Sequence, residues 1–285
     1  MVKKFLSLTI VGMFSTLSLI GVAYSAAIAP APALTFQNGF YAGAAGGVSA
    51  ISNKYDNKAE GTIGDAGGVL NSRYANTTGN NGLTGGLFIG YEHFFHNKYS
   101  LGVELAGYYN SAEAKQTDGI VGQETQDDYI ATLHVLNKVK QTYNFDLTIQ
   151  PGVLINNTYL SYLRLGVSLA RMQVNDEESI SSTSSTAITN SIYNIPSDHV
   201  NVFGYVVGLG VRKLLTKNVS VFGEIDHYAY ASKSFKNGTF HLRESAATAD
   251  NLALGTYKRK SAIHNNVLRV GFIYNFGDDF GNFKV

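Results

Sequence analysis

The chain contains no cysteine and no tryptophan, and only 4 of its 285 residues are proline. Without cysteine, the protein cannot carry a disulfide framework or a cysteine-ligated metal centre. Charged residues are also scarce, at 15%, and the formal net charge is only +1. A balance of this kind gives no broad basic field of the sort that attracts nucleic acid. Disulfide-stapled domains and nucleic-acid-binding proteins are therefore excluded.

The sequence also lacks the common motifs of enzymes. No HExxH pattern, GxxxxGK[ST] loop or GxGxxG in a strand-turn-helix setting occurs. Asp226 and His227 resemble half of a hydrolytic dyad, but neighbours in a strand point to opposite faces. A pair such as His264 with Ser261 leaves a lipid hydrolase as a minor alternative. We therefore expect no catalytic residues, no metal and no cofactor.

The first residues, MVKKFLSLTIVGMFSTLSLIGVAYSA, follow the layout of a secretory signal peptide. Two lysines precede an apolar run from Phe5 to Val22, and small residues follow it. We expect residues 1–25 to be removed after export, with an uncleaved membrane anchor as the alternative. Residues 26–37, which begin with an Ala/Pro-rich stretch, form a linker to the folded domain.

What the chain has in abundance is glycine (30 residues) and the strand-forming tyrosine and phenylalanine (18 and 16). Apolar residues alternate with period two in eight segments, which predicts an all-β domain over residues 38–276 and a tail over 277–285. The segments are 39–51, 82–95, 99–111, 141–155, 159–174, 201–214, 219–231 and 262–276.

The connections between these segments alternate in length. Three are tight polar turns, at residues 96–98, 156–158 and 215–218. Four are long and rich in Asn, Ser, Thr and Gly, at residues 52–81, 112–140, 175–200 and 232–261. All long connections therefore lie at one end of the strands. This asymmetry predicts a closed, antiparallel, eight-stranded transmembrane β-barrel with four long extracellular loops and short periplasmic turns.

The two faces of each segment favour lipid outside and a narrow lumen inside. Leu101, Val103 and Leu105 form an apolar row, whereas the opposite row carries Gly, Ala and isolated charges rather than the Lys and Glu of a soluble wall. We therefore expect the apolar rows to face lipid. Aromatic residues near the row ends form interfacial girdles: Tyr91, Phe95, Tyr99, Tyr109, Tyr274 and Phe276.

Successive side chains of a strand point alternately to lipid and to the lumen, and we call this assignment the parity of the strand. The parity directs seven charged residues into the lumen: Glu104, Asp146, Arg164, Arg212, Glu224, Asp226 and Arg269. Eight strands enclose a space just wide enough for side chains to fill. Charges buried there must pair, because an isolated buried charge is very costly. The set is expected to be a luminal ionic network that plugs the barrel. A switchable salt-bridge gate for small ions is the functional alternative.

Three strands carry a family resemblance: GFYAGAAGGVSA (39–50), GEIDHYAY (223–230) and VLRVGFIYNF (267–276). With the loop asymmetry, they resemble the eight-stranded outer-membrane β-barrels of Gram-negative bacteria, of the OmpA-like transmembrane or opacity-protein type. The resemblance implies an outer-membrane location. It also implies that the last strand, with Tyr274 and Phe276, is recognised by the barrel-assembly machinery, although GDDFGNFKV follows Phe276.

Taken together, these patterns predict a monomeric surface protein with a structural role in the envelope and loops for adhesion or host contact. Its expected partners are outer-membrane lipid and lipopolysaccharide, the assembly machinery and a host-surface ligand. A narrow porin-like channel for ions or small solutes is the alternative function.

Overall fold

The computed structural model describes residues 34–63, 68–96, 98–115, 120–126, 129–183, 188–243 and 251–277. The predicted signal peptide, the linker up to residue 33 and the tail from residue 278 lie outside these ranges. The last linker residues contact the barrel: Phe36 stacks on Phe94 at 5.6 Å, and the Asn275 side chain donates to the Gln37 carbonyl. No helix within the described ranges is long and apolar enough to cross a membrane.

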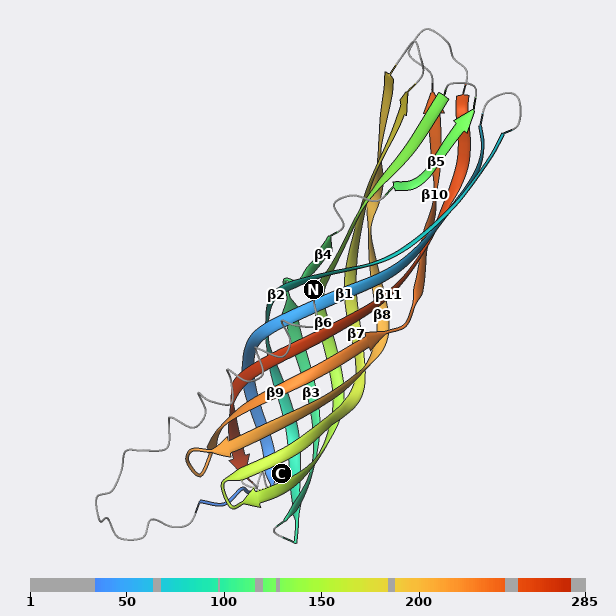
Figure 1. Cartoon of the computed structure of the whole chain (residues 1–285). Helices are drawn as coiled ribbons and strands as arrows, with labels where there is room; N and C mark the ends of the chain where they lie inside the picture. The colour runs from blue at the N-terminus through green and yellow to red at the C-terminus, as the bar shows by residue number, and fades with distance from the viewer. Residues whose placement is uncertain are drawn as a thin grey trace, which may run out of the picture. The chain divides into compact units, whose positions relative to one another are not determined.

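The described chain is built of antiparallel strands. They are β1 (Gly39–Ile63), β2 (Gly68–Phe95), β3 (Tyr99–Asn110), β4 (Glu113–Lys115), β5 (Ile120–Gln126), β6 (Tyr129–Asn156), β7 (Tyr159–Thr183), β8 (Ile188–Leu214), β9 (Val219–Tyr230), β10 (Lys233–Arg243) and β11 (Asn251–Gly277). Eight of them form a ring in the order β1-β2-β3-β6-β7-β8-β9-β11, which pairing of β1 with β11 closes (Figure 1). The predicted eight-stranded antiparallel barrel is confirmed.

A belt of large apolar side chains covers the outside of the ring. Alternation along β3 is complete: Leu101, Val103 and Leu105 are about half exposed, whereas Glu104 between them is buried. The belt continues through other strands, for example with Leu147 on β6 and Leu209 on β8. So much contiguous apolar surface is unfavourable in water and suits the hydrocarbon of a bilayer. The predicted parity is therefore correct.

The predicted aromatic girdles also lie on the outer face. Five of the six side chains are between 39% and 54% exposed, and Phe276 is half-buried: the five are Tyr91, Phe95, Tyr99, Tyr109 and Tyr274. Tyr91 meets Phe40 edge-on at 5.0 Å, and Tyr274 meets Phe276 in the same way at 5.0 Å. These pairs lie near the end of the barrel that carries the short turns.

The prediction of four long solvated loops is wrong in its extent. Strands β1, β2, β6, β7, β8 and β11 are 25 to 28 residues long, and they continue far into the predicted loop regions. At about 3.3 Å per residue such a strand is roughly 80–90 Å long, whereas an apolar band is only about 25 Å tall. Most of the residues assigned to loops therefore form paired strands outside the membrane, which we call the extension.

Above the belt the ring divides into two antiparallel sheets. One has the order β2-β1-β11-β10; in the other, β6, β7 and β8 continue with β4 and β5 beside β6 (Figure 1). Within the described residues, the ladder between β2 and β3 stops at Thr84, and that between β8 and β9 stops at Gly204. Two seams therefore separate the sheets.

Each seam begins where the apolar belt ends. The last backbone hydrogen bonds across the seams run from Ser111 to the Leu83 carbonyl and from Ala231 to the Phe203 carbonyl. Leu83 and Phe203 are 69% and 68% exposed, and each is the last large apolar side chain of the belt on its strand. Closed pairing is thus retained where lipid surrounds the wall, and it is released where water does.

Close packing inside the ring depends on glycines that lie opposite large side chains. Tyr162 faces Gly210 across the β7–β8 ladder, and a Cβ at Gly210 would lie 2.2 Å from the Tyr162 ring. Phe222 faces Gly271 in the same way, with a distance of 2.6 Å. The aromatic rings of Tyr162 and Phe222 therefore occupy the space that a side chain on the neighbouring strand would fill.

We predict that Gly210→Ala destabilises the barrel by about 1–3 kcal/mol, the usual cost of overpacking. Tyr162 cannot move aside freely, because it also bonds Glu224. Gly223→Ala is the matched control, since its Cβ would meet nothing closer than the Arg269 carbonyl oxygen at 3.9 Å. Urea unfolding of both variants in the same detergent measures the difference. Equal midpoints would show that the aromatic side chain of Tyr162 moves aside for the added methyl group without a loss of stability.

Candidate functional site

Arg164 of β7 lies at the centre of the barrel. Its side chain is fully buried and lies within 3.1 Å of Asp146 on β6 and 3.1 Å of Asp226 on β9, measured from nitrogen to oxygen. Glu104 of β3 lies at 3.4 Å, and the guanidinium also donates to the Tyr228 hydroxyl at 3.0 Å. One cation therefore joins three carboxylates from three other strands.

Arg269 of β11, the arginine in the middle of the last strand, points into the same space. Its Nε lies 3.0 Å from Glu224, and its guanidinium donates to Asp226 and to the Tyr228 hydroxyl. The guanidinium carbon lies 3.8 Å from the centre of the Tyr108 ring, a close cation–π contact. Asp226 and Tyr228 are shared with Arg164, so the two arginines belong to one network.

Arg212 of β8 forms a separate pair closer to the short turns. It donates to Glu92 of β2, and both side chains are almost completely buried. Its guanidinium lies between two tyrosine rings, 5.1 Å from Tyr41 and 5.6 Å from Tyr162. Glu92 was missed in the sequence analysis, although the parity of its strand directs it inward. Among the described residues, the charged lumen thus contains five carboxylates and three guanidiniums.

Tyrosine hydroxyls compensate for part of this imbalance. Three of them donate to luminal carboxylates: Tyr41 to Glu104 at 3.2 Å, Tyr162 to Glu224 at 3.1 Å and Tyr228 to Asp146 at 2.8 Å. A hydrogen bond to a charged acceptor is stronger than one between neutral groups, and it costs no further charge. The excess carboxylates are therefore stabilised without additional cations.

A layer of amide side chains lies above the ionic network, towards the extension. Gln141 is at its centre: it accepts from Asn265 at 2.9 Å and donates to Asn144 and the Tyr230 hydroxyl. The chain of bonds continues to Ser49 at one end, and at the other Asn144 donates to Asp146 at 2.7 Å. No repeated motif in the sequence marks this layer, so pattern reasoning did not identify it.

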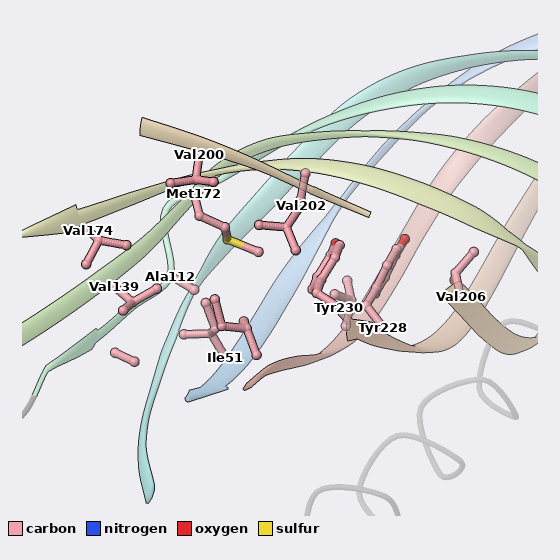
Figure 2. Close-up of a cluster of buried hydrophobic side chains, with 14 residues drawn as sticks. Ile51, Ala112, Val139, Met172, Val174, Val200, Val202, Val206, Tyr228 and Tyr230 are labelled. Carbon is pink, nitrogen blue, oxygen red and sulfur yellow. The ribbon is translucent and has the colours of Figure 1, made fainter. Parts of the chain in front are cut away.

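An apolar cluster of buried side chains lies inside the barrel on the extension side (Figure 2). Both sheets contribute to it, for example with Ile51 and Ile263 from one and Val139, Met172 and Val202 from the other. Each of these side chains is at most 4% exposed. The sequence analysis expected small residues and isolated charges along the whole lumen. At the level of the apolar cluster this expectation is wrong, because larger apolar side chains fill the space where the ring begins to divide.

All seven residues predicted for the luminal network are buried inside the ring: Glu104, Asp146, Arg164, Arg212, Glu224, Asp226 and Arg269. Six of them form the continuous network around Arg164 and Arg269, and Arg212 pairs with Glu92. Tyr274 and Phe276, predicted for the assembly strand, lie in β11 and on the outer face, where β11 closes the ring against β1.

The residues considered for hydrolytic chemistry do not converge. Asp226 is buried in the lumen, whereas its neighbour His227 is exposed on the outside. His227 stacks on His264 at 5.7 Å, and Ser261 is buried on the opposite face from His264. Among the described residues, no group of three or more His, Asp or Glu side chains is placed so that it could hold a metal ion.

A family model described as the outer membrane protein beta-barrel domain matches residues 19–276. The chain belongs to this family. It is consequently a protein of the Gram-negative outer membrane, which its transmembrane ring crosses.

Comparison with individual proteins adds some that are similar to this chain. An uncharacterised protein of Coxiella burnetii is 27% identical over 236 residues, which are 83% of each chain. Among solved structures, OprG of Pseudomonas aeruginosa is 13% identical with a TM-score of 0.40, and it covers 85% of this chain and 98% of its own. Ail of Yersinia pestis is 13% identical with a TM-score of 0.27, covering 76% and 98%.

We predict that Arg269→Ala destabilises the barrel by roughly 3–5 kcal/mol, because Glu224 and Asp226 lose a buried partner. Replacing both members of the peripheral pair, with Arg212→Met and Glu92→Met, should cost much less than Arg212→Met alone, since no buried charge is left uncompensated.

Both comparisons require unfolding midpoints in one detergent, measured beside Lys217→Ala, which removes an exposed cation. If Arg269→Ala unfolds at the wild-type midpoint, the luminal charges are solvated rather than paired. If the double variant is as unstable as the single one, packing rather than charge compensation determines the cost.

Proposed function

We propose that the protein acts through its outer surface, as a structural component of the envelope whose extension contacts surfaces outside the cell, including those of a host. The single observation that carries this proposal is the extension itself. Six strands of 25 to 28 residues continue beyond the apolar belt as two paired sheets. Structure of this size is not needed to cross the membrane.

The interior of the barrel supports a role outside it. Three successive layers occupy the lumen: the ionic network, the amide layer and the apolar cluster. A conducting pore needs a continuous wet path, and the buried apolar side chains of the cluster give water few polar partners. The porin-like alternative is therefore the weaker of the two functions.

The geometry also supports a non-enzymatic role. A hydrolase needs a nucleophile or activated water within hydrogen-bond reach of a base. The candidate partners Asp226 and His227 lie on opposite sides of the barrel wall, as do Ser261 and His264. We accordingly propose no catalytic activity and no cofactor for this protein.

The proposed partners follow from the surfaces. Outer-membrane lipid and lipopolysaccharide contact the belt, and a host-surface ligand contacts the extension. During biogenesis, the barrel-assembly machinery is the proposed partner of β11 with its outward Tyr274 and Phe276. The ring is closed, and its described strands leave no free edge at belt level, which supports a monomer.

We predict that the refolded protein gives no steady current in a planar bilayer, and that Arg269→Ala is equally silent. Removing Arg269 leaves the amide layer and the apolar cluster intact, and these still occlude the lumen. Single-channel recording tests this, with folding checked by the different gel migration of heated and unheated samples. A steady current that the substitution changes would favour the narrow channel instead.

We further predict that the extension mediates attachment. Asp176 and Ile195 are cross-strand partners, so residues 177–194 can be replaced by Asn-Gly, a two-residue hairpin turn. Expressed in a non-adherent Gram-negative strain, the wild type should raise attachment to cultured epithelial cells above that of the empty vector, and the shortened variant should lose most of this gain.

The matched control shortens the other sheet. Glu60 and Asn71 are also cross-strand partners, and replacing residues 61–70 with Asn-Gly removes the tip of the β1–β2 hairpin. A selective loss in one variant identifies the sheet that carries the contact. Wild-type cells that attach no better than empty-vector cells would rule out adhesion.

A further inference from the structure

Arg171 of β7 lies on the outer face of the barrel, immediately above the apolar belt. It follows Leu169 in the outward row of its strand and is half-buried. Its cross-strand partner on β6 is Tyr143, which stands directly above the exposed Phe145 in the same way. The long-loop end of an outer-membrane barrel is extracellular, so Arg171 lies at the upper border of the outer leaflet.

Tyr143 holds the Arg171 side chain in place. The guanidinium donates to the Tyr143 hydroxyl at 2.9 Å and lies 5.8 Å from the centre of its ring. Tyr143 is itself fixed by an edge-on contact with Phe145 at 5.8 Å. An arginine that is oriented in advance loses less side-chain entropy when it binds a ligand. The guanidinium has five N–H donors, and only one of its nitrogens bonds Tyr143.

Further cations lie directly above Arg171 on the same face. Lys140 on β6 pairs with Gln173, two residues beyond Arg171 on β7, so it is the diagonal neighbour of Arg171. Diagonal neighbours on an antiparallel sheet are about 7–8 Å apart, within reach of two long side chains. Lys138 lies one further step up the same row. Glu113 of β4 is the direct cross-strand partner of Lys140, and its carboxylate lies 3.4 Å from the Lys115 ammonium group.

The surface below these cations is apolar. Phe145 and Leu147 are 55% and 52% exposed on β6, and Tyr109, the cross-strand partner of Tyr143 on β3, is 54% exposed. The face therefore presents cations above an apolar wall, with tyrosines at the border. An amphiphile with an anionic head close to its acyl chains matches this order, whereas a free anion would use only the upper half.

We propose that Arg171 and Lys140 form a binding site for a phosphate group of lipopolysaccharide, whose acyl chains lie against Phe145 and Leu147. Guanidinium binds phosphate through a planar pair of N–H donors, which suits Arg171 for the direct contact. Lys140 adds a point charge to the same phosphate or to one next to it. The inference rests on the proposed contact of lipopolysaccharide with the belt and is independent of attachment through the extension.

The opposite border of the belt provides a matched control. Lys213 lies over Tyr159 at 5.4 Å, close to a short turn on the periplasmic side. This pair also places a cation on a tyrosine of the outer face, but it faces the leaflet that contains no lipopolysaccharide. Substitution of Lys213 changes net charge as much as substitution of Arg171 does, without touching the proposed site.

The test is titration of the folded, full-length barrel in zwitterionic micelles with purified bisphosphorylated lipid A, followed by native mass spectrometry and by the shift in unfolding temperature. We expect Arg171→Gln to weaken binding by on the order of 10-fold or more, the effect of one charge-assisted hydrogen bond. Arg171→Lys should be intermediate, because it keeps the charge and loses the planar donors. Lys213→Gln should bind as the wild type does.

Three results would overturn the proposal. Arg171→Gln could bind lipid A as tightly as Lys213→Gln does, dephosphorylated lipid A could bind as tightly as the bisphosphorylated form, or inorganic phosphate could compete at the same concentration as lipid A. The second result would assign binding to the acyl chains alone, and the third would indicate a free-anion site. Heat-dependent gel migration of each variant separates loss of the site from loss of the barrel. None of the three results bears on attachment or conductance.

Discussion

The narrow bore of an eight-stranded ring is the constraint on which the interior depends. It leaves space for side chains but little for bulk water, so each luminal group must be packed and each charge paired by another side chain. Glycine opposite a large aromatic side chain, as with Gly210 opposite Tyr162, solves the packing problem. Guanidiniums shared between carboxylates, as at Arg164 and Arg269, solve the electrostatic one. Both solutions join side chains of different strands, which fixes the register of the ring.

The solvent around the wall determines how far the ring stays closed. In hydrocarbon an unpaired backbone group costs several kcal/mol, so a free strand edge is not tolerated. In water the same edge is hydrated. The seams begin at Leu83 and Phe203, where the apolar exterior ends, and this coincidence follows directly from that difference. The apolar cluster packs inside the barrel at this level, with side chains from both sheets.

Sequence patterns predicted the ring well and the extension poorly, for a physical reason. In the membrane the two faces of a strand meet lipid and lumen, so alternation is strong and assigns even Arg269 to the correct side. In the extension both rows of β1 beyond Ile51 are largely polar, and alternation disappears although the strand continues to Ile63. Pairing between strands supplies the stability there, and no single strand's pattern reveals it.

The candidate site was also predictable from the sequence only in part. The alternation of side chains along each strand predicts which charged residues enter the lumen. The same alternation along β2 directs Glu92 inward, although the sequence analysis did not include it. Which carboxylate meets which arginine depends on the stagger between strands, since Arg164 reaches residues on β3, β6 and β9 at once. The contact between Arg171 and Tyr143 likewise depends on the register of β6 against β7, which a bulge near Gln141 shifts.

Pairing of the outer segments into sheets changes what recognition at this surface costs. A flexible loop must give up its conformational freedom when it binds, and this loss is subtracted from the affinity of every contact it makes. Hydrogen-bonded hairpins such as β7–β8 have already lost that freedom during folding. The same rigidity restricts sequence change, because a substitution that alters the exposed face of a hairpin must also preserve its partner across the ladder.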